Sequence, residues 1–230
     1  MSGVGVILPA YNAARFLAGV IADIRGVMPD IRILVVDDGS ADGTADAART
    51  AGVDLIVHPE NRGKGAALAT GFAWAVDNDL EWVYTMDSDG QHLPQEMPAF
   101  LAAARAGDFD VVVGNRMRDT AAMPWLRKRT NEFTSWVVSR LAGTAIPDSQ
   151  NGYRLFRAAK LRGLTLKTTR YDTESEILVR LARRGCTIGE APTATVYGDE
   201  KSSINPLVDT GRFFRLVGTL LVSRREERRP

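Results

Sequence analysis

Two aspartates separated by one serine, Asp87 and Asp89, directly follow an apolar run at residues 82–86. Alternation along an extended segment places both carboxylates on the same side of the chain. Hard oxygen donors in this arrangement suit Mg²⁺ or Mn²⁺, and such an ion can in turn bind a diphosphate. We therefore predict a divalent-cation site here, against the alternative that the pair belongs to a simple turn.

A second acidic segment follows the second apolar run and has two interpretations. Asp42 or Ser40 can cap the helix that comes next. Asp38 directly follows a run that reads as a buried strand, and we predict that it bonds a nucleotide base or ribose. The glycine- and lysine-containing segment 61–65 is interpreted as a turn and helix start, with Lys64 near a diphosphate.

The first half of the chain supplies elements that can bring these residues together. Short β-branched runs alternate with longer segments of helical periodicity, which predicts a mostly parallel sheet covered by helices. The predicted strands are residues 4–8, 31–36, 54–57, 82–86 and 111–114. Such sheets bind ligands outside the carboxyl ends of their strands, where the aspartates fall. A basic helical stretch after residue 116 and a helix at 173–184 follow without a linker, so we expect one α/β domain.

The net charge of +1 conceals two halves of opposite sign. Residues 1–115 carry 7 Lys and Arg against 16 Asp and Glu, whereas residues 116–230 carry 22 against 12. The first half suits a cation and the second suits phosphates. Aromatic side chains for stacking on bases are not interleaved with the basic residues, so nucleic-acid binding is not expected.

The C-terminal segment predicts an amphipathic basic helix. Its apolar face comprises Phe213, Phe214, Val217, Leu220 and Leu221, and paired arginines follow. This helix either lies peripherally on the inner face of a membrane or docks on the domain. No signal segment and no run of about 18 apolar residues is present, so we expect a cytoplasmic protein. We divide the chain into a catalytic domain at 1–205 and a helix with tail at 206–230.

Four segments, in this order, resemble the inverting glycosyltransferase family 2 with the GT-A fold. They are residues 8–12 (LPAYN), 35–40 (VVDDGS), 61–65 (NRGKG) and 86–92 (MDSDGQH). Later segments resemble the branch of dolichol-phosphate mannose synthase and bacterial polyprenyl-phosphate glycosyltransferases. They are residues 114–116, 148–154, 176–178 and 197–202. The resemblance covers nearly the whole chain and implies a mixed, mostly parallel sheet flanked by helices.

The resemblance also implies roles for individual residues. The nucleoside would be framed by Pro9, Tyr11, Val36 and Asp38. Metal and diphosphate would be held by Asp87, Ser88, Asp89 and Gln91, with Gln91 as a further metal ligand. Arg116 and Lys201 would close over the phosphates, and the acceptor would meet Arg127, Asn131, Arg154 and Glu176. The catalytic set is then Asp89, Gln91, Arg116 and Glu176. Asn131 departs from the branch, which carries serine there.

The implied reaction is metal-dependent transfer of mannose or glucose, from GDP-mannose or UDP-glucose, to polyprenyl phosphate. A phosphate monoester is already anionic near neutral pH because its second pKa is about 6. Arginines can then position the acceptor without a dedicated base. One alternative is a glycosyltransferase of cell-envelope glycan synthesis that acts on a saccharide hydroxyl and needs a base. The other is a non-catalytic nucleotide-sugar-binding protein.

Overall fold

The computed structural model describes residues 3–118, 120, 123–169, 172–194, 211, 213 and 215–221. The strands are β1 (Val4–Ala10), β2 (Arg32–Asp37), β3 (Asp54–Val57), β4 (Trp82–Thr85), β5 (Val111–Asn115), β6 (Arg154–Arg157) and β7 (Ile188–Pro192). The α-helices are α1 (Ala14–Val27), α2 (Thr44–Thr50), α3 (Lys64–Asp77), α4 (Met97–Gly107), α5 (Trp125–Ala142) and α6 (Asp172–Arg183). Short 3₁₀ turns are η1 (Pro94–Glu96), η2 (Arg116–Arg118) and η3 (Ala158–Leu161).

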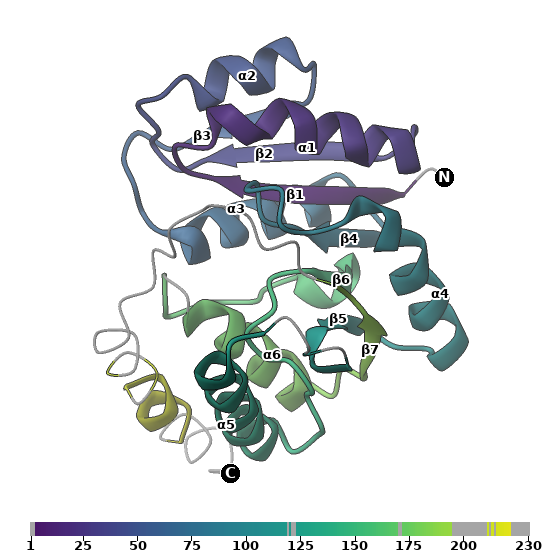
Figure 1. The fold of residues 1–230 in the computed structure, drawn as a ribbon, viewed down its shortest axis with the longest axis vertical. Coiled ribbons are helices and arrows are strands. Elements are labelled where there is room, and N and C mark those ends of the chain that lie inside the picture. Colours follow the sequence, from purple (N-terminus) through teal and green to yellow (C-terminus); the bar gives the residue numbers. More distant parts are fainter. Residues whose placement is uncertain are drawn as a thin grey trace.

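The strands form one sheet in the order β3-β2-β1-β4-β6-β5-β7 (Figure 1). Strand β6 pairs antiparallel with both β4 and β5, and the other neighbours are parallel. This confirms the predicted mixed, mostly parallel sheet flanked by helices. All five predicted strands exist, whereas β6 and β7 were not predicted. Because β6 lies between β4 and β5, the two oppositely charged halves of the sequence share one sheet.

Two apolar clusters, one on each face of the sheet, hold the helices in place. One cluster packs α1, α2 and α4 against the sheet, and the other packs α3, α5 and α6. The central strand β1 serves both: Val6 and Leu8 belong to the first cluster and Ile7 to the second. Burial on both faces explains why residues 4–10 form a continuous apolar run rather than an alternating one.

The described part of the C-terminal helix docks on the domain. Leu216 and Leu220 are buried in the second apolar cluster, and Phe213 and Val217 pack against it. The Arg183 guanidinium donates a hydrogen bond to the carbonyl oxygen of Leu220 at 2.9 Å. These contacts agree with docking on the domain, which is one of the two alternatives predicted for this helix. Phe214 and the terminal arginines lie outside the described residues. Within the described part of the chain, no helix has the length and apolar character needed to cross a bilayer.

The parallel strands β1, β2 and β4 end at the same edge of the sheet. Strand β1 lies between the other two, and its register places Ala10 opposite Asp37 and Ile7 opposite Thr85. Ligands of open α/β sheets bind outside the carboxyl ends of such strands. A ligand site is therefore expected at the loops that follow β1, β2 and β4.

Candidate active site

Asp87 and Asp89 lie in the loop after β4, and neither is sealed in the core. The Asp87 side chain is 31% exposed, and Asp89 is partly exposed. Burial and the negative charge of Asp87 together raise the pKa of Asp89, so the two carboxylates interact. The backbone N–H of Gln91 donates to Asp89 at 2.9 Å, which fixes the turn. The predicted pair of interacting acidic groups is therefore present at the strand end.

A single ammonium group joins this loop to a distant helix. Lys64 Nζ, at the start of α3, lies 2.5 Å from Asp87 Oδ1 and 2.5 Å from Glu174 Oε1 on α6. Burial by itself lowers the pKa of Lys64, but the charges of Asp87 and Glu174 raise it above its ordinary value. Burial likewise raises the pKa of Asp87, while Lys64 and His92 bring it below its ordinary range. Lys64 and Asp87 are thus both charged at neutral pH.

Gly152 leaves the space that this cluster occupies. A Cβ atom at residue 152 would lie 2.9 Å from Glu174 Oε1, 3.0 Å from Lys64 Nζ and 3.1 Å from Asp87 Oδ1. The first distance is shorter than real Cβ atoms show, and the other two are tighter than most real Cβ contacts, so a side chain here would displace the charged groups. The glycine is therefore a part of the site that the charged residues alone did not reveal.

His92 is buried beside Asp87, and its imidazole lacks hydrogen bonds within the described part of the chain. Neither ring nitrogen makes a hydrogen bond with the described residues, and Nε2 lies 3.6 Å from Asp87 Oδ2. Its ring packs against Tyr153 with 5.1 Å between centroids. Buried polar atoms are rarely left unpaired, so an unmatched imidazole beside two carboxylates is typical of a site that holds a ligand.

The loops after β1, β2 and β4 are tied to one another. Ser88 Oγ donates to the carbonyl oxygen of Pro9 at 3.0 Å. The backbone N–H of Asn12 donates to Ser40 Oγ at 2.8 Å. Between these ties Tyr11 is 52% exposed, an open aromatic ring at the end of β1. Pro9 and Val36 are buried in the adjoining strands, so Tyr11 is the predicted nucleoside residue whose side chain is most open to a ligand.

Asp38 is used within the chain. It is 3% exposed, and its carboxylate accepts hydrogen bonds from the backbone N–H groups of Arg62 at 3.0 Å and Gly63 at 2.7 Å. His58 Nδ1 lies 2.7 Å from the same carboxylate. These contacts fix the loop that leads into α3. The predicted contact of Asp38 with a nucleotide base or ribose remains a prediction. No motif in the sequence marked His58, which contacts the Asp38 carboxylate together with the backbone of the loop.

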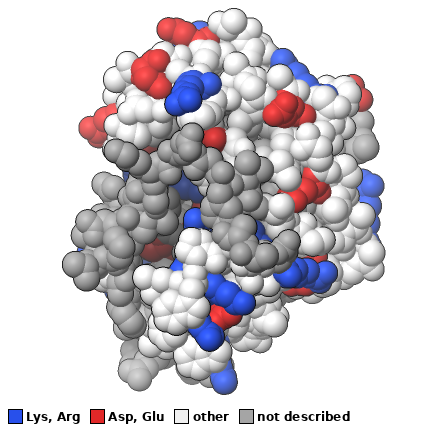
Figure 2. All heavy atoms as spheres, viewed as in Figure 1, with Lys and Arg blue, Asp and Glu red and all other residues white. Residues whose placement is uncertain are grey.

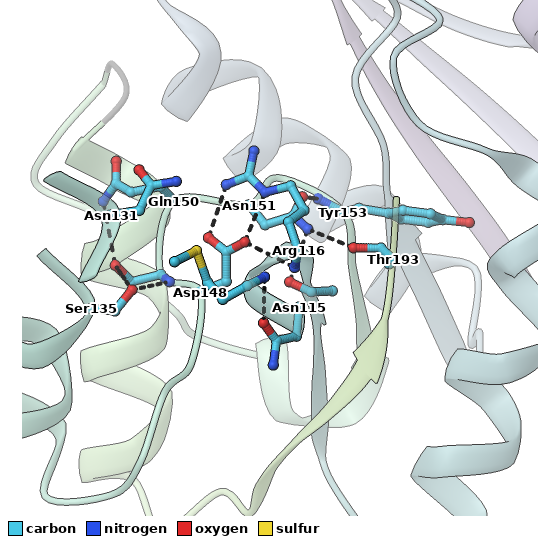
Figure 3. A network of polar contacts seen from close by, with 12 residues as sticks. Asn115, Arg116, Asn131, Ser135, Asp148, Gln150, Asn151, Tyr153 and Thr193 are labelled. Atoms are coloured by element: carbon cyan, nitrogen blue, oxygen red, sulfur yellow. Dashed lines mark hydrogen bonds and ion pairs between the residues drawn. The ribbon is translucent and has the colours of Figure 1, made fainter. Parts of the chain in front are cut away.

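The segment 148–154 forms a buried polar network with residues at the end of β5 and on α5 (Figure 3). Arg116 binds Asp148 through two hydrogen bonds, Nε to Oδ2 at 2.7 Å and Nη2 to Oδ1 at 2.9 Å. Asn151 Nδ2 donates to the carbonyl oxygen of Gly114 at 2.9 Å and contacts Thr193 Oγ1 at 3.2 Å. The network therefore holds the end of β5, where Arg116 lies, in a fixed position.

Arg154 and Glu176 bind the chain itself. Arg154 is 1% exposed, and its guanidinium donates to the backbone carbonyls of Ser149, Asn151 and Glu174. Glu176 is fully buried and accepts hydrogen bonds from the backbone and hydroxyl of Thr168, the backbone of Lys167 and the guanidinium of Arg180. Their acceptor-binding and catalytic roles remain predictions, and the contacts observed are structural.

The inner face of α5 carries two of the predicted acceptor residues. Arg127 is partly buried, and Asn131 follows one turn later on the same side. Asn131 is 6% exposed, and its Nδ2 donates no hydrogen bond to the described residues. Ser135, a further turn along, binds Ser149 of the buried network. Lys201 lies outside the described residues, so its position over the phosphates stays a prediction.

The donor set fits a divalent cation bound together with a diphosphate. In the part of the chain that the structure describes, no group of three or more His, Cys, Asp or Glu side chains could hold a metal alone. Mg²⁺, however, is usually bound by one or two carboxylates plus waters and substrate phosphates. The raised pKa of Asp89 marks negative charge that a cation would neutralise. Asp87, Asp89 and the side-chain amide of Gln91 are the protein oxygens that would hold it.

Comparison with known proteins bears on what this arrangement does. The family model described as glycosyl transferase family 2 matches residues 5–165. The undecaprenyl-phosphate mannosyltransferase of Micrococcus luteus is 34% identical over 211 residues, 86% of either chain. The UDP-N-acetylglucosamine–dolichyl-phosphate N-acetylglucosaminyltransferase of Methanococcus voltae is 29% identical over 236 residues, 92% of this chain and 94% of its own.

A solved structure shows the same fold. Glucosyl-3-phosphoglycerate synthase from Mycobacterium tuberculosis, crystallised with Mn²⁺, uridine-diphosphate and phosphoglyceric acid, matches with a TM-score of 0.71 at 21% identity. The match covers 96% of this chain and 78% of that one.

Proposed function

Because this chain belongs to glycosyl transferase family 2 and has the GT-A fold, we propose that it transfers a hexose from a nucleotide sugar to polyprenyl phosphate. It is a glycosyltransferase, as the sequence predicted. The donor in this proposal is GDP-mannose or UDP-glucose, and the anomeric carbon is inverted. The name of the relative from Micrococcus luteus, an undecaprenyl-phosphate mannosyltransferase, supports the acceptor.

The observation that carries the proposal is that the buried carboxylates of residues 123–194 are already engaged. Asp148 binds Arg116, Glu174 binds Lys64, and Glu176 accepts several hydrogen bonds. A carboxylate held in this way is a poor general base, because its negative charge is already stabilised by the groups that it binds. The pKa of Glu176 is lowered in this way, since its hydrogen bonds outweigh the opposing effect of burial. A saccharide hydroxyl would need a base, whereas a lipid phosphate oxygen is already anionic.

The inner face of α5 supports a phosphate acceptor. The Nδ2 group of Asn131 donates no hydrogen bond to the described residues, and it lies on the same side of this helix as the guanidinium of Arg127. Guanidinium and amide donors suit phosphate oxygens. An oxygen held by these donors would attack the anomeric carbon, while the bond between that carbon and the nucleoside diphosphate breaks and its electron pair leaves with the diphosphate.

The donor side requires neutralisation of that leaving group. A divalent cation on Asp87 and Asp89 would supply Lewis-acid stabilisation of the departing diphosphate. Lys64 places its positive charge against the Asp87 carboxylate. Arg116 lies at the end of β5, where Asp148 holds it in position. Tyr11 offers an exposed ring on which a base can stack. These groups position the donor before transfer, so little reorganisation is needed as charge develops.

The test is a comparison of two acceptors that differ by one phosphate. Purified protein is given labelled GDP-mannose or UDP-glucose with either polyprenyl phosphate or the matched polyprenol, and with Mg²⁺, Mn²⁺ or chelator. We expect label in the organic phase with polyprenyl phosphate only, and none with chelator. The product should release free sugar in mild acid, as a glycosyl phosphate does.

Other results would favour the alternatives. Label on polyprenol or on a water-soluble saccharide, with none on polyprenyl phosphate, would make the protein a transferase of hydroxyl acceptors. Tight binding of a nucleotide sugar without turnover of any acceptor would make it a non-catalytic binding protein.

A further inference from the structure

The outer face of α5 is apolar where a solvated helix is normally polar. Trp125, Leu126, Phe133 and Trp136 are 70%, 68%, 50% and 57% exposed. Their spacing places them on one side of the helix, opposite the inner face that contributes Val138 and other residues to the second apolar cluster. A helix that buries one apolar face and presents another has a second surface to cover.

The aromatic side chains on this face are arranged with arginines. The rings of Phe133 and Trp136 are stacked, with 6.3 Å between centroids and 29° between planes. The Arg140 guanidinium lies 5.6 Å from the centroid of the Trp136 ring. Arg129 is exposed on the same side and pairs with Glu132 at 3.0 Å. Tryptophan next to long basic side chains is typical of the membrane–water interface, where rings and aliphatic stems enter the apolar region and charges stay outside it.

The charge of α5 suits an anionic surface. The helix contains Arg127, Lys128, Arg129 and Arg140 against one acidic residue, Glu132. In Figure 2, basic and uncharged side chains lie together over the end of the molecule that holds α5, whereas acidic side chains are scattered over the part formed by the first strands and helices. Basic groups close to an anionic bilayer each contribute about 1 kcal/mol of attraction, roughly fivefold in affinity.

We propose that the outer face of α5, defined by Trp125, Leu126, Phe133 and Trp136 with Arg129 and Arg140, docks the protein on the surface of an anionic lipid bilayer. The inner face of the same helix carries Arg127 and Asn131, so docking places the acceptor side of the site next to the membrane. Only this placement rests on the proposed function. The surface lies on α5, whereas Leu216 and Leu220 of the C-terminal helix are buried in the domain.

The experiment measures flotation of the full chain with phosphatidylcholine vesicles, with and without phosphatidylglycerol, and all free of polyprenyl phosphate. The test variant carries Trp125→Ser, Phe133→Ser and Trp136→Ser together. The matched control is Val57→Ser on the edge strand β3, which removes another exposed apolar side chain, 47% exposed. A second pair of variants tests the effect of charge: Arg140→Gln on α5 is compared with Arg49→Gln on α2.

We expect wild type and Val57→Ser to bind vesicles that contain phosphatidylglycerol, and the triple variant to bind at least tenfold more weakly with an unchanged melting temperature. Arg140→Gln should weaken binding about fivefold, and Arg49→Gln should not. Equal binding by the triple variant, or no binding by wild type, would overturn the proposal. So would a dimer in solution that the triple variant dissociates, because a second copy would then cover this face.

Transfer to a short polyprenyl phosphate dispersed in detergent separates this proposal from the proposed function. The triple variant should keep that transfer, because the substituted side chains face away from the site. Vesicle binding without any transfer would leave the docking surface standing and refute the acceptor.

Discussion

Replacing Lys64 by methionine should destabilise the protein, because its ammonium group is the shared partner of two carboxylates. Lys64 Nζ lies 2.5 Å from Asp87 Oδ1 and 2.5 Å from Glu174 Oε1, and the three side chains are 21%, 31% and 7% exposed. Removing one partner of a buried ion pair costs about 3–5 kcal/mol, since the remaining charge stays buried without compensation. Partial exposure of Asp87 lets water compensate in part, so we expect a loss of roughly 2–4 kcal/mol.

The measurement is thermal unfolding followed by circular dichroism. For a chain of this size, 1 kcal/mol shifts the melting temperature by about 2–4 °C, so the variant should melt roughly 5–15 °C lower. Lys64→Arg, which keeps the charge, should recover part of this loss. The matched control is Lys160→Met, which removes a 45% exposed lysine that lies 3.3 Å from Asp110. That change should cost less than about 1 kcal/mol. Equal losses for the two methionine variants would refute the assigned role of Lys64.

Three further predictions test other parts of the site. Glu176→Gln should lose about 1.5–3 kcal/mol at neutral pH. The pKa of Glu176 is held below its ordinary value of 4.5, so its stabilisation is complete above that pH and the difference from wild type should shrink as pH falls from 5 to 3 in urea titrations. Gly152→Ala should reduce transfer at least tenfold, because its Cβ would press on the charged cluster, while Gly19→Ala, with nothing within 4 Å, should leave transfer unchanged. Asn131→Asp should raise KM for polyprenyl phosphate by repulsion, and Asn131→Ser should not. These predictions would be contradicted by a pH-independent stability difference for Glu176→Gln, by full activity of Gly152→Ala, or by an unchanged KM for Asn131→Asp.

The sequence predicted the strands that form short apolar, β-branched runs and missed β6 and β7, which do not. The run that forms β1 is uniformly apolar, so its strand could be recognised directly. Strand β6 begins and ends with arginine. Arg157 is accommodated by ion pairs with Asp108 and Asp110 and by stacking over Trp82, with 4.7 Å from its guanidinium carbon to the ring centroid. Contacts of this kind are formed only in the folded chain, so no local pattern predicts them.

The candidate site divides in the same way. Asp87 and Asp89 could be predicted because they directly follow a strand. Glu174 could not, because it is separated by 110 residues from Lys64, the residue that it binds. The basic stretch after residue 116 predicted a helix with a charge suited to phosphates, yet its charges gave no indication that Trp125 and Trp136 lie exposed together on its outer face.

The most direct test of the account is whether the two aspartates bind a cation together with a nucleoside diphosphate. Free Mn²⁺ is measured by electron paramagnetic resonance during titration of wild type, Asp89→Asn and the exposed control Asp46→Asn, each with and without GDP or UDP. We predict that wild type and Asp46→Asn take up Mn²⁺ far more tightly with the diphosphate than without it, and that Asp89→Asn loses this gain at least tenfold. Equal uptake by Asp89→Asn and wild type would contradict the assignment of the carboxylates after β4 as the donor site.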